Sequence, residues 1–364
     1  HALRHSDAEL VLIDRRNHHI FQPLLYQVAT AVLSPSEIAA PIRQLEATQR
    51  NVTVLLAEVT GIDIASHTIE ASSPGVGVRK IGFDYLVIAT GMRPSYFGHD
   101  EFARYAPALK NLNDAETIRA KILALAQMVK VTLRGNFRRI DPAKASIILL
   151  DAGKRVLPTF AESLSRKVAG HLDKLGVTVL PGVKVETVDE QGVIAGGNRI
   201  PSATVLWTAG VMASPIPKML GSKTDRAGRA LVDPFLKVVD APGVFVVGDA
   251  ASVMQDEHPV PGVAQAAIQE GRYVGRLIAK ELKGRKVKRP FRYFDKGNMA
   301  VVGKNYAVLQ RGWLRTSGFL TWLVWAFVHV LSLPQLQNRL RVQRQWLWSY
   351  FTGQRSSRLI PEPP

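Results

Sequence analysis

Apolar runs that end in turn residues recur along the 364-residue chain. Residues 10–14 form one such run, which ends in Asp14, and residues 85–91 form a second, which ends in Thr-Gly. The same two features return in the second half, where one run ends at Asp151 and another, residues 203–210, ends in Ala-Gly. Short continuous runs of this kind are typical of parallel strands covered on both faces. The repeat therefore predicts two α/β domains built on parallel sheets.

Stretches with helical spacing lie between these runs. Residues 114–127 carry apolar positions at that spacing, with Asp114 as the expected N-terminal cap. Residues 163–175 form a second expected helix, which Gly176 ends. A third expected helix, residues 263–282, follows an apolar run that ends in Gly-Asp.

The strand-end acids are the first candidates for function. A dinucleotide-binding sheet presents an acid at a strand end to a ribose hydroxyl, and Asp14 and Asp151 both fit this position. Taken singly, each is better explained as an ordinary turn or cap residue. Together with the Thr-Gly, Ala-Gly and Gly-Asp runs, they form an ordered set that favours dinucleotide binding. The expected glycine-rich loop is missing, because its nearest approach, Gly75-Val-Gly77, has Lys80 in place of the third glycine.

The net charge indicates which binding partners are expected, and the cysteine content excludes some kinds of chemistry. The net charge of +17 indicates attraction to a polyanion, which is a nucleic acid, an anionic membrane or a phosphorylated substrate. The chain has no cysteine, which excludes structural disulfides, thiolate metal sites and redox chemistry through a cysteine pair. His18 and His19 are expected to be packing or polar-network residues, since no set with metal-ligand spacing accompanies them. We therefore predict no metal site.

The C-terminal stretch, residues 311–364, carries the clearest partner signal. It holds seven arginines, one acid and five of the six tryptophans. Its most apolar part, residues 319–333, is shorter than the roughly twenty residues that span a bilayer. Arginines beside tryptophans and leucines suit helices that lie on an anionic membrane surface. A buried helical hairpin or a homodimer interface is the alternative, and nucleic acid is not expected because no reader motif is present.

These features occur in an order that resembles a known family, the type II NADH:quinone dehydrogenases, which are flavoprotein reductases with two dinucleotide-binding domains. Phe-Gln-Pro-Leu-Leu-Tyr-Gln and Ala-Gln-x-Ala-x-Gln are specific to that family, whereas the Thr-Gly and Gly-Asp elements belong to the wider superfamily. The matching segments run through almost the whole chain: residues 12–35, 85–91, 156–160, 205–211, 244–252, 261–271 and 295–304.

The resemblance implies two Rossmann-like domains, a C-terminal helical region on the membrane, and the cofactors FAD and NADH. It implies hydride transfer from NADH to FAD and then reduction of quinone without proton pumping. Because the chain has no cysteine, electrons that leave the flavin must reach a diffusible acceptor. The resemblance implies a peripheral membrane protein on the cytoplasmic face of the inner membrane. The implied domains are residues 1–112 and 233–310 for FAD, 113–232 for NADH, and 311–364 for the membrane.

The resemblance also implies roles for single residues. Asp14 would hold the FAD ribose, and Asp151 the NADH ribose, where its charge repels a 2′-phosphate. Gln265 and Gln269, four residues apart, share one helix face and would line the quinone site; spacing alone would make them surface amides. Lys296 is implied to contact the flavin edge or to remain a solvated surface residue. The remaining implied cofactor-binding residues are Thr90, Gly91, Ala209, Gly210, Gly248, Asp249 and Ala264.

The chain departs from the family at two places. The glycine-rich first strand of the FAD domain should precede His1, and that of the NADH domain should follow the helix that ends near Gln127. Loss of either would remove the central strand of a sheet, and buried unpaired backbone groups cost roughly 1–3 kcal/mol each. We therefore hypothesise that the natural polypeptide contains both segments.

Two other functions compete with this interpretation. One is a soluble NAD(P)H-dependent flavin reductase that uses another acceptor. The other is a non-catalytic membrane-surface relative that has lost cofactor binding. A colourless purified protein that releases no flavin on denaturation would favour the latter.

Overall fold

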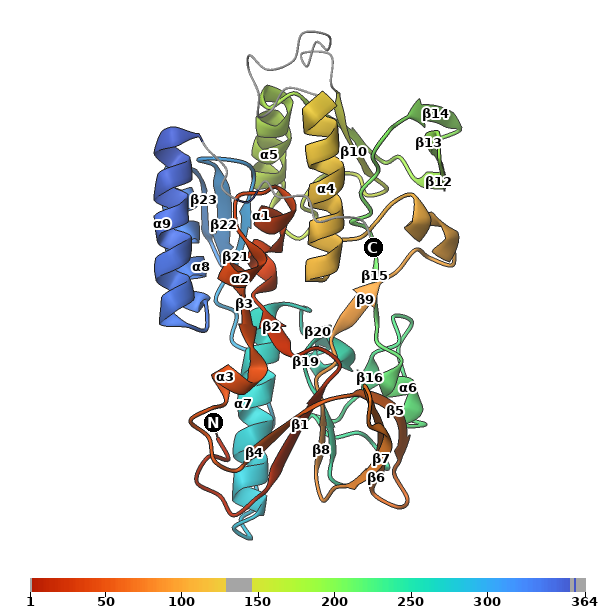
Figure 1. The fold of residues 1–364 in the computed structure, drawn as a ribbon, viewed down its shortest axis with the longest axis vertical. Helices are drawn as coiled ribbons and strands as arrows, with labels where there is room; N and C mark the ends of the chain where they lie inside the picture. The colour runs from red at the N-terminus through yellow and green to blue at the C-terminus, as the bar shows by residue number, and fades with distance from the viewer. Residues whose placement is uncertain (1, 129–145, 354–356, 358–364) are drawn as a thin grey trace. The chain divides into compact units, whose positions relative to one another are not determined.

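The computed structural model describes residues 2–128, 146–353 and 357. By its internal contacts the chain forms two units, each assembled from three separate segments (Figure 1). The first unit holds residues 1–19, 41–95 and 209–295, and the second holds residues 20–40, 96–208 and 296–364. This division says nothing about which cofactor each part binds, so the predicted domain boundaries stay a prediction.

Two of the three parallel strand pairs described in the first unit involve the predicted apolar runs. Strand β1 (Leu10–Asp14) pairs with β4 (Val52–Leu56), and β8 (Leu86–Ile88) pairs with β17 (Val244–Val246). The other elements of this unit are α3 (Ile42–Leu45), β5 (Glu58–Asp63), β6 (Thr68–Ser73), β7 (Gly77–Gly82), β9 (Met92–Pro94), β15 (Val211–Ala213), α6 (Ile216–Met219), β16 (Ala230–Leu231), η4 (Gly248–Ala250), β18 (Ala251–Ser252), β19 (Met254–Gln255), β20 (His258–Pro259) and α7 (Ala264–Glu281).

The core of this unit lies where β17 meets α7. The three residues of β17 are fully buried, and they pack with Val274 and Leu277 of α7. Helix α7 begins and ends within two residues of the predicted helix 263–282. Its apolar stripe recurs at helical spacing, so one face is held against the sheet.

The two parallel pairs are not joined into one sheet by any described strand. Val11 of β1 and Val87 of β8 are 39% and 41% exposed, which is unusual for apolar residues of parallel strands. This is the arrangement expected if the central strand is missing. Val11 and Val87 thus depart from the predicted cover on both faces, whereas Ile88 and all three residues of β17 are buried as predicted.

The second unit shows the same gap. Strand β10 (Ile147–Asp151) pairs in parallel only with β11 (Val177–Pro181) among the described residues, and Ile147 is 60% exposed. Residues 203–210, predicted as a strand, form no strand; they make a single bridge, from Trp207 to Ala108. A strand needs a neighbour to bond, and no strand among residues 2–128, 146–353 and 357 pairs with this run. The second glycine-rich strand, expected after the helix that ends near Gln127, would border residues 129–145, which lie outside the described residues.

The helices of the second unit form largely where predicted. Helix α5 (Glu162–Lys174) is followed by Gly176, whose φ of +79° suits the predicted stop. Helix α4 (Leu112–Met128) starts earlier than expected: the Asn111 side chain accepts the Asp114 N–H at 3.0 Å, and the Asp114 carboxylate accepts the Asn111 N–H at 3.0 Å. Asn111 is therefore the cap, and Asp114 is its reciprocal partner.

The C-terminal helices pack on a sheet and on helices from the start of the chain. Helix α8 (Phe319–Ser332) covers an antiparallel sheet, and α9 (Leu336–Thr352) contacts α2 (Figure 1). Trp325 and Leu333 are buried in this core. The remaining elements are β2 (His18–Ile20), η1 (Gln22–Leu24), α1 (Leu25–Ala29), α2 (Pro35–Ile38), β3 (Ala39–Pro41), η2 (Asp100–Arg104), β12 (Val185–Asp189), β13 (Gly192–Ala195), β14 (Asn198–Pro201), β21 (Asn298–Val301), β22 (Ala307–Arg311) and β23 (Leu314–Gly318).

The Phe-Gln-Pro-Leu-Leu-Tyr-Gln motif holds the last helix in place. Gln27, only 7% exposed, accepts the Trp346 indole N–H at 2.6 Å and donates to the Tyr26 hydroxyl at 2.9 Å. Asn338, also buried, donates to the Ala39 carbonyl oxygen at 3.3 Å. Buried amides are stable only when they are bonded in this way. The motif is therefore structural, and it fixes α9 against the start of the chain.

Candidate functional site

The two turns predicted to meet the cofactors lie together in the first unit. The strands that follow them, β9 after Gly91 and β15 after Gly210, pair with each other in antiparallel fashion. The Ser95 N–H donates to the Gly210 carbonyl at 3.2 Å, and the Ser214 hydroxyl donates to the Thr90 hydroxyl at 2.6 Å. Sequence reasoning missed Ser214. No sequence pattern around Ser214 indicates that the strands following the two turns pair with each other.

Both glycine turns need glycine for their backbone. Gly91 has a φ of +64° and Gly210 a φ of +75°, in the left-handed region that side chains rarely adopt. A Cβ built on Gly91 would meet no atom within 4 Å, so its surface is open to a ligand. The open backbone at Gly91 fits the close approach of a cofactor.

The Gly-Asp turn lies directly beneath α7. Gly248 has a φ of +67°, and an added Cβ would lie 3.2 Å from the Cβ of Ala267. Asp249 is half-buried, and a Cβ added at Gly262 would lie 3.5 Å from its Oδ1. Gly262 is therefore a site residue that sequence reasoning missed; its signal is its place just before Ala264, at the start of α7. The turn, the glycine and the helix N-terminus form one surface.

The two predicted glutamines both lie on α7, but their environments differ. The Gln269 amide donates to the Phe294 carbonyl at 3.0 Å and accepts the Phe294 N–H at 2.9 Å. It thus holds the strand-like segment that precedes Lys296. Gln265 is half-buried one helical turn earlier. Gln269 therefore fixes the backbone at Phe294. Its place in a quinone site stays a prediction.

Glu270 is a buried acid that sequence reasoning missed. Its side chain is 3% exposed, and its Oε2 accepts the Gly248 N–H at 2.5 Å. Burial raises the pKa of this carboxyl to about 7; the Gly248 hydrogen bond opposes the rise, and the nearby Asp249 carboxylate adds to it. A glutamate next to the Ala-Gln-x-Ala-x-Gln motif is expected on the helix surface. The sequence alone therefore does not indicate that Glu270 is buried.

The two strand-end acids make the same local contact. Asp14 Oδ1 accepts the Arg16 N–H at 2.8 Å, and Asp151 Oδ1 accepts the Gly153 N–H at 2.8 Å. This is the turn-forming role that either acid has on its own. Each carboxylate has a second oxygen, so the turn and a ribose contact are compatible.

Lys296 belongs to the second unit and is exposed. Its neighbour Gly297 has a φ of +94°, and an added Cβ would lie 2.7 Å from the Cβ of Arg311 and 2.8 Å from the Gln310 carbonyl oxygen. The lysine is therefore placed by a glycine that tolerates no side chain.

We expect Gly297→Ala to move Lys296 and to destabilise the second unit by roughly 1–3 kcal/mol, because both the backbone angle and the contact oppose a side chain. Urea denaturation measures the loss. Gly312→Ala is the matched control, since Gly312 also has a positive φ, of +55°, but an added Cβ there meets no atom within 4 Å. Equal losses in the two variants would contradict the steric argument.

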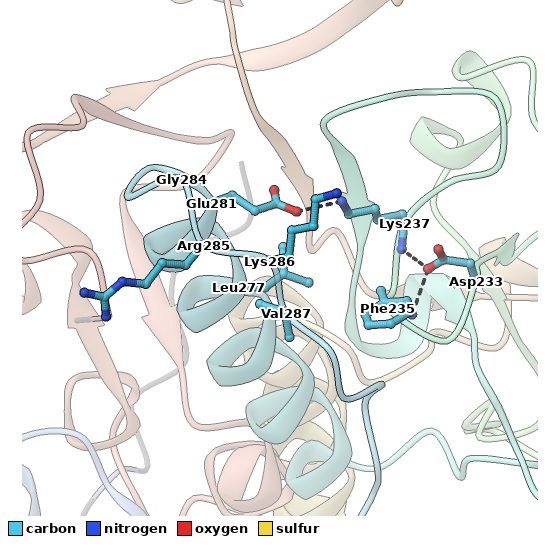
Figure 2. Close-up of a pocket in the computed structure, with 9 residues that line it drawn as sticks. All are labelled: Asp233, Phe235, Lys237, Leu277, Glu281, Gly284, Arg285, Lys286 and Val287. Atoms are coloured by element: carbon cyan, nitrogen blue, oxygen red, sulfur yellow. Dashed lines mark hydrogen bonds and ion pairs between the residues drawn. The ribbon is translucent and has the colours of Figure 1, made fainter.

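A cavity of about 420 Å³ lies at the other end of α7 (Figure 2). There the Lys237 ammonium pairs with Glu281 at 2.8 Å, and Asp233 accepts the N–H of Lys237 at 2.8 Å. Lys237 and Glu281 thus neutralise each other, whereas Asp233 bonds the backbone N–H of Lys237. Helix α7 places Glu281 about 25 Å from Ala264. The lining residues are Asp233, Phe235, Lys237, Leu277, Glu281, Gly284, Arg285, Lys286 and Val287.

The described residues carry no visible metal site. In residues 2–128, 146–353 and 357, no three His, Cys, Asp or Glu side chains lie close enough to share an ion. Burial lowers the pKa of His18 and of His19.

The residues that are present fit part of a flavin dinucleotide. Asp14 suits a ribose, the open Gly91 turn suits close approach, and the Gly248–Asp249 turn below the N-terminus of α7 suits the polar chain next to the ring. No described residue supplies a glycine-rich diphosphate loop between β1 and β8. The described residues thus suit the parts of FAD on either side of its diphosphate. The glycine-rich loop that would bind the diphosphate is not among them.

Comparisons with known proteins agree with this arrangement. Residues 1–271 match the family model described as pyridine nucleotide-disulphide oxidoreductase. The type II NADH:quinone oxidoreductase Ndh of Mycobacterium tuberculosis is 37% identical over 406 positions, covering 99% of this chain and 87% of the relative. A second protein of that organism, NdhA, is 36% identical over 99% of this chain and 86% of its own length. Both alignments are longer than the 364 residues of this chain, so these relatives contain internal segments that it lacks.

Solved structures share the fold. NDH2 of Plasmodium falciparum in complex with NADH superposes with a TM-score of 0.84, at 19% identity, over 96% of this chain and 94% of that one. The sulfide:quinone oxidoreductase of Aquifex aeolicus gives 0.68, at 14% identity, over 97% and 88%. These likenesses confirm the predicted mixed α/β architecture. Together with the sequence identities, they show that the chain belongs to the pyridine nucleotide-disulphide oxidoreductase family and, within it, to the type II NADH:quinone oxidoreductases.

Proposed function

We propose that the protein oxidises NADH and reduces a quinone through bound FAD, without pumping protons. The observation that carries this proposal is the 37% identity to a type II NADH:quinone oxidoreductase over 99% of the chain, joined to the Gly91, Gly210 and Gly248 turns of the first unit. When bound, FAD accepts a hydride from NADH and passes two electrons to the quinone. The absence of cysteine from the chain supports a diffusible acceptor.

The protein's own groups bind and orient. Asp14 would accept a hydroxyl of the FAD ribose, and Asp249 would bond the polar chain near the ring. The N-terminus of α7, at Ala264 and Gln265, would direct its positive end toward negative charge that develops on the ring. Lys296 would contact the ring edge. No protein nucleophile is needed, so positioning and electrostatics are the protein's contribution.

NADH is the proposed nicotinamide cofactor because of Asp151. Its carboxylate lies at the end of β10, held by the Gly153 N–H. A carboxylate there repels the 2′-phosphate of NADPH and accepts a 2′-hydroxyl. Ala209 and Gly210 would face the nicotinamide. Gln265 and Gln269 would contribute to the quinone side of α7.

We also propose that the protein lies on an anionic membrane, on the cytoplasmic face of the inner membrane, through α8 and α9. None of the helices described is both long and apolar enough to cross a bilayer. The exposed apolar residues of these two helices are the support: Phe319, Leu320, Leu323, Val324, Phe327, Val328, Leu331, Leu336, Leu340, Leu347, Trp348 and Phe351. Exposed Arg341 and Arg344 of α9 add positive charge beside them. Exposed apolar groups and arginines together suit the headgroup region.

The natural polypeptide is further proposed to contain the glycine-rich strand of each domain. The unpaired edges of β1, β8 and β10 among the described residues support this, and the greater length of both alignments supports an internal segment. Intact mass spectrometry of a folded, flavin-containing preparation tests it. A mass of 40.0 kDa, that of this chain alone, would overturn it.

An NADH:quinone assay on the full-length protein, with FAD content measured in parallel, tests the function. We expect a yellow protein with about one FAD per chain that reduces quinone with NADH. A colourless protein that releases no flavin would overturn the proposal in favour of a non-catalytic membrane-surface relative. Flavin content with activity toward dyes but not quinones would favour the flavin reductase.

A further inference from the structure

Glu270 occupies a position that the proposed reaction does not explain. It lies on α7 immediately after Gln269, but it points into the protein and is 3% exposed. Its Oε2 is 2.5 Å from the Gly248 nitrogen, and it is the side chain that bonds the start of the Gly-Asp turn. A glutamate is rarely buried without an opposite charge beside it. The charged group that acts on it from η4 is another acid, Asp249.

The turn that Glu270 holds has little freedom to move. The Val247 N–H donates to the Ile88 carbonyl at 2.9 Å, which ties the turn to β8. On the other side, Gly248 lies against Ala267 of α7 closely enough that an added Cβ would be 3.2 Å from the Ala267 Cβ. Glu270 therefore fixes the backbone of Gly248, and through it the direction in which Asp249 points.

The protonation state of Glu270 changes the charge next to this turn. As a carboxylate, it places a negative charge beside Asp249, at the turn proposed to bind FAD, whose diphosphate is also negative. As a neutral acid, it still offers an oxygen to the Gly248 N–H but removes that charge. Binding an anionic ligand next to a buried acid therefore favours proton uptake by the acid.

We propose that Glu270 is a positioning residue that takes up a proton when the Gly248–Asp249 turn binds FAD, so that flavin affinity falls as the pH rises. The inference rests on the proposed function, because it takes FAD to be the ligand of this turn. Burial places the pKa of Glu270 at about 7 in the protein alone, which puts the change in the neutral range. One linked proton changes affinity by up to tenfold per pH unit between the free and the bound pKa.

The test is a titration of the full-length apoprotein with FAD between pH 6 and pH 8, followed by flavin fluorescence. For the wild type we expect the dissociation constant to rise by roughly five- to tenfold over this range. Glu270→Gln, which keeps an oxygen for Gly248 but carries no charge, should give a nearly flat profile. Glu281→Gln is the matched control: it removes an acid from the same helix that pairs with Lys237, and it should keep the wild-type slope.

A second measurement needs no flavin. A folded-state pKa raised from 4.5 to about 7 means that the folded chain keeps a proton that the unfolded chain releases. The contribution to stability is therefore present below pH 4.5 and is lost as the pH rises to about 7. The unfolding midpoint of Glu270→Gln relative to wild type should rise across that window.

The outcomes separate the inference from the function. A flat wild-type profile, or equal slopes in wild type and Glu270→Gln, overturns the role of Glu270 while leaving flavin binding intact. An unchanged difference in unfolding midpoint between pH 5 and pH 8 also overturns it. Failure of the wild type to bind FAD at every pH overturns the proposed function instead.

Discussion

Substitution of both Leu320 and Phe327 by aspartate is expected to abolish binding to anionic liposomes while leaving activity with a water-soluble quinone largely unchanged. These side chains of α8 are 75% and 65% exposed, so the fold loses little when they change. Inserting a leucine or phenylalanine into the headgroup region is worth about 1.5–3 kcal/mol. Two such losses weaken binding by roughly a hundredfold or more. Vesicle co-sedimentation of the full-length protein measures the effect.

The matched control uses two exposed valines of the first unit. Val76 and Val78 are 57% and 63% exposed, and their replacement by aspartate makes the same change of charge. This variant should still sediment with vesicles. Equal loss in both variants would show that net charge alone governs binding, and equal retention would reject α8 as the lipid-binding surface.

Point substitution is a better test than removal of the C-terminal stretch. Cutting the chain at Arg311 would take away β23, which pairs with β22, and the buried residues Trp325 and Leu333. The second unit would lose part of its core. Loss of activity after such a cut would therefore not distinguish membrane binding from unfolding.

Replacement of Asp151 by asparagine is expected to raise the ratio of kcat/KM for NADPH to that for NADH by roughly tenfold or more. The carboxylate repels a 2′-phosphate, and a tenfold change corresponds to about 1.4 kcal/mol, which is modest for one charge pair near a protein surface. Asparagine can still accept the Gly153 N–H that Asp151 accepts at 2.8 Å, so the turn should survive. Steady-state rates with both cofactors measure the ratio.

Asp189→Asn serves as the control for this prediction. Asp189 also ends a strand of the second unit, but both of its oxygens accept from Arg199, at 2.9 and 2.8 Å. Its loss should leave the cofactor ratio unchanged. If Asp151→Asn behaves in the same way, Asp151 has only the turn-forming role that its contact with Gly153 demonstrates.

The sequence predicted those elements whose signals are local. Residues 10–14 and 147–151 became strands, and Gly176 ended its helix, because apolar runs and left-handed glycines act within a few residues. It failed at residues 203–210, which form one bridge but pair with no strand in the described part of the chain. A strand needs two segments, and the sequence of one segment does not show whether a partner pairs with it.

The candidate site shows the same difference between local and long-range features. The turns at Gly91, Gly210 and Gly248 could be predicted because positive backbone angles carry a sequence signature, while the part of these turns in cofactor binding stays a prediction. The residues that support them could not. Glu270 and Ser214 contact the turns from 22 and 124 positions away along the chain, and their letters alone fit a solvated surface equally well.

The bond between Gln27 and Trp346 joins positions 319 apart, nearly the full length of the polypeptide. The partner for α9 is thus synthesised long before the helix itself. Contacts of such high sequence separation form late in folding and pay the entropy of closing the whole loop. Helix α9, part of the surface proposed to meet lipid, therefore cannot complete its packing until most of the other described elements have been synthesised.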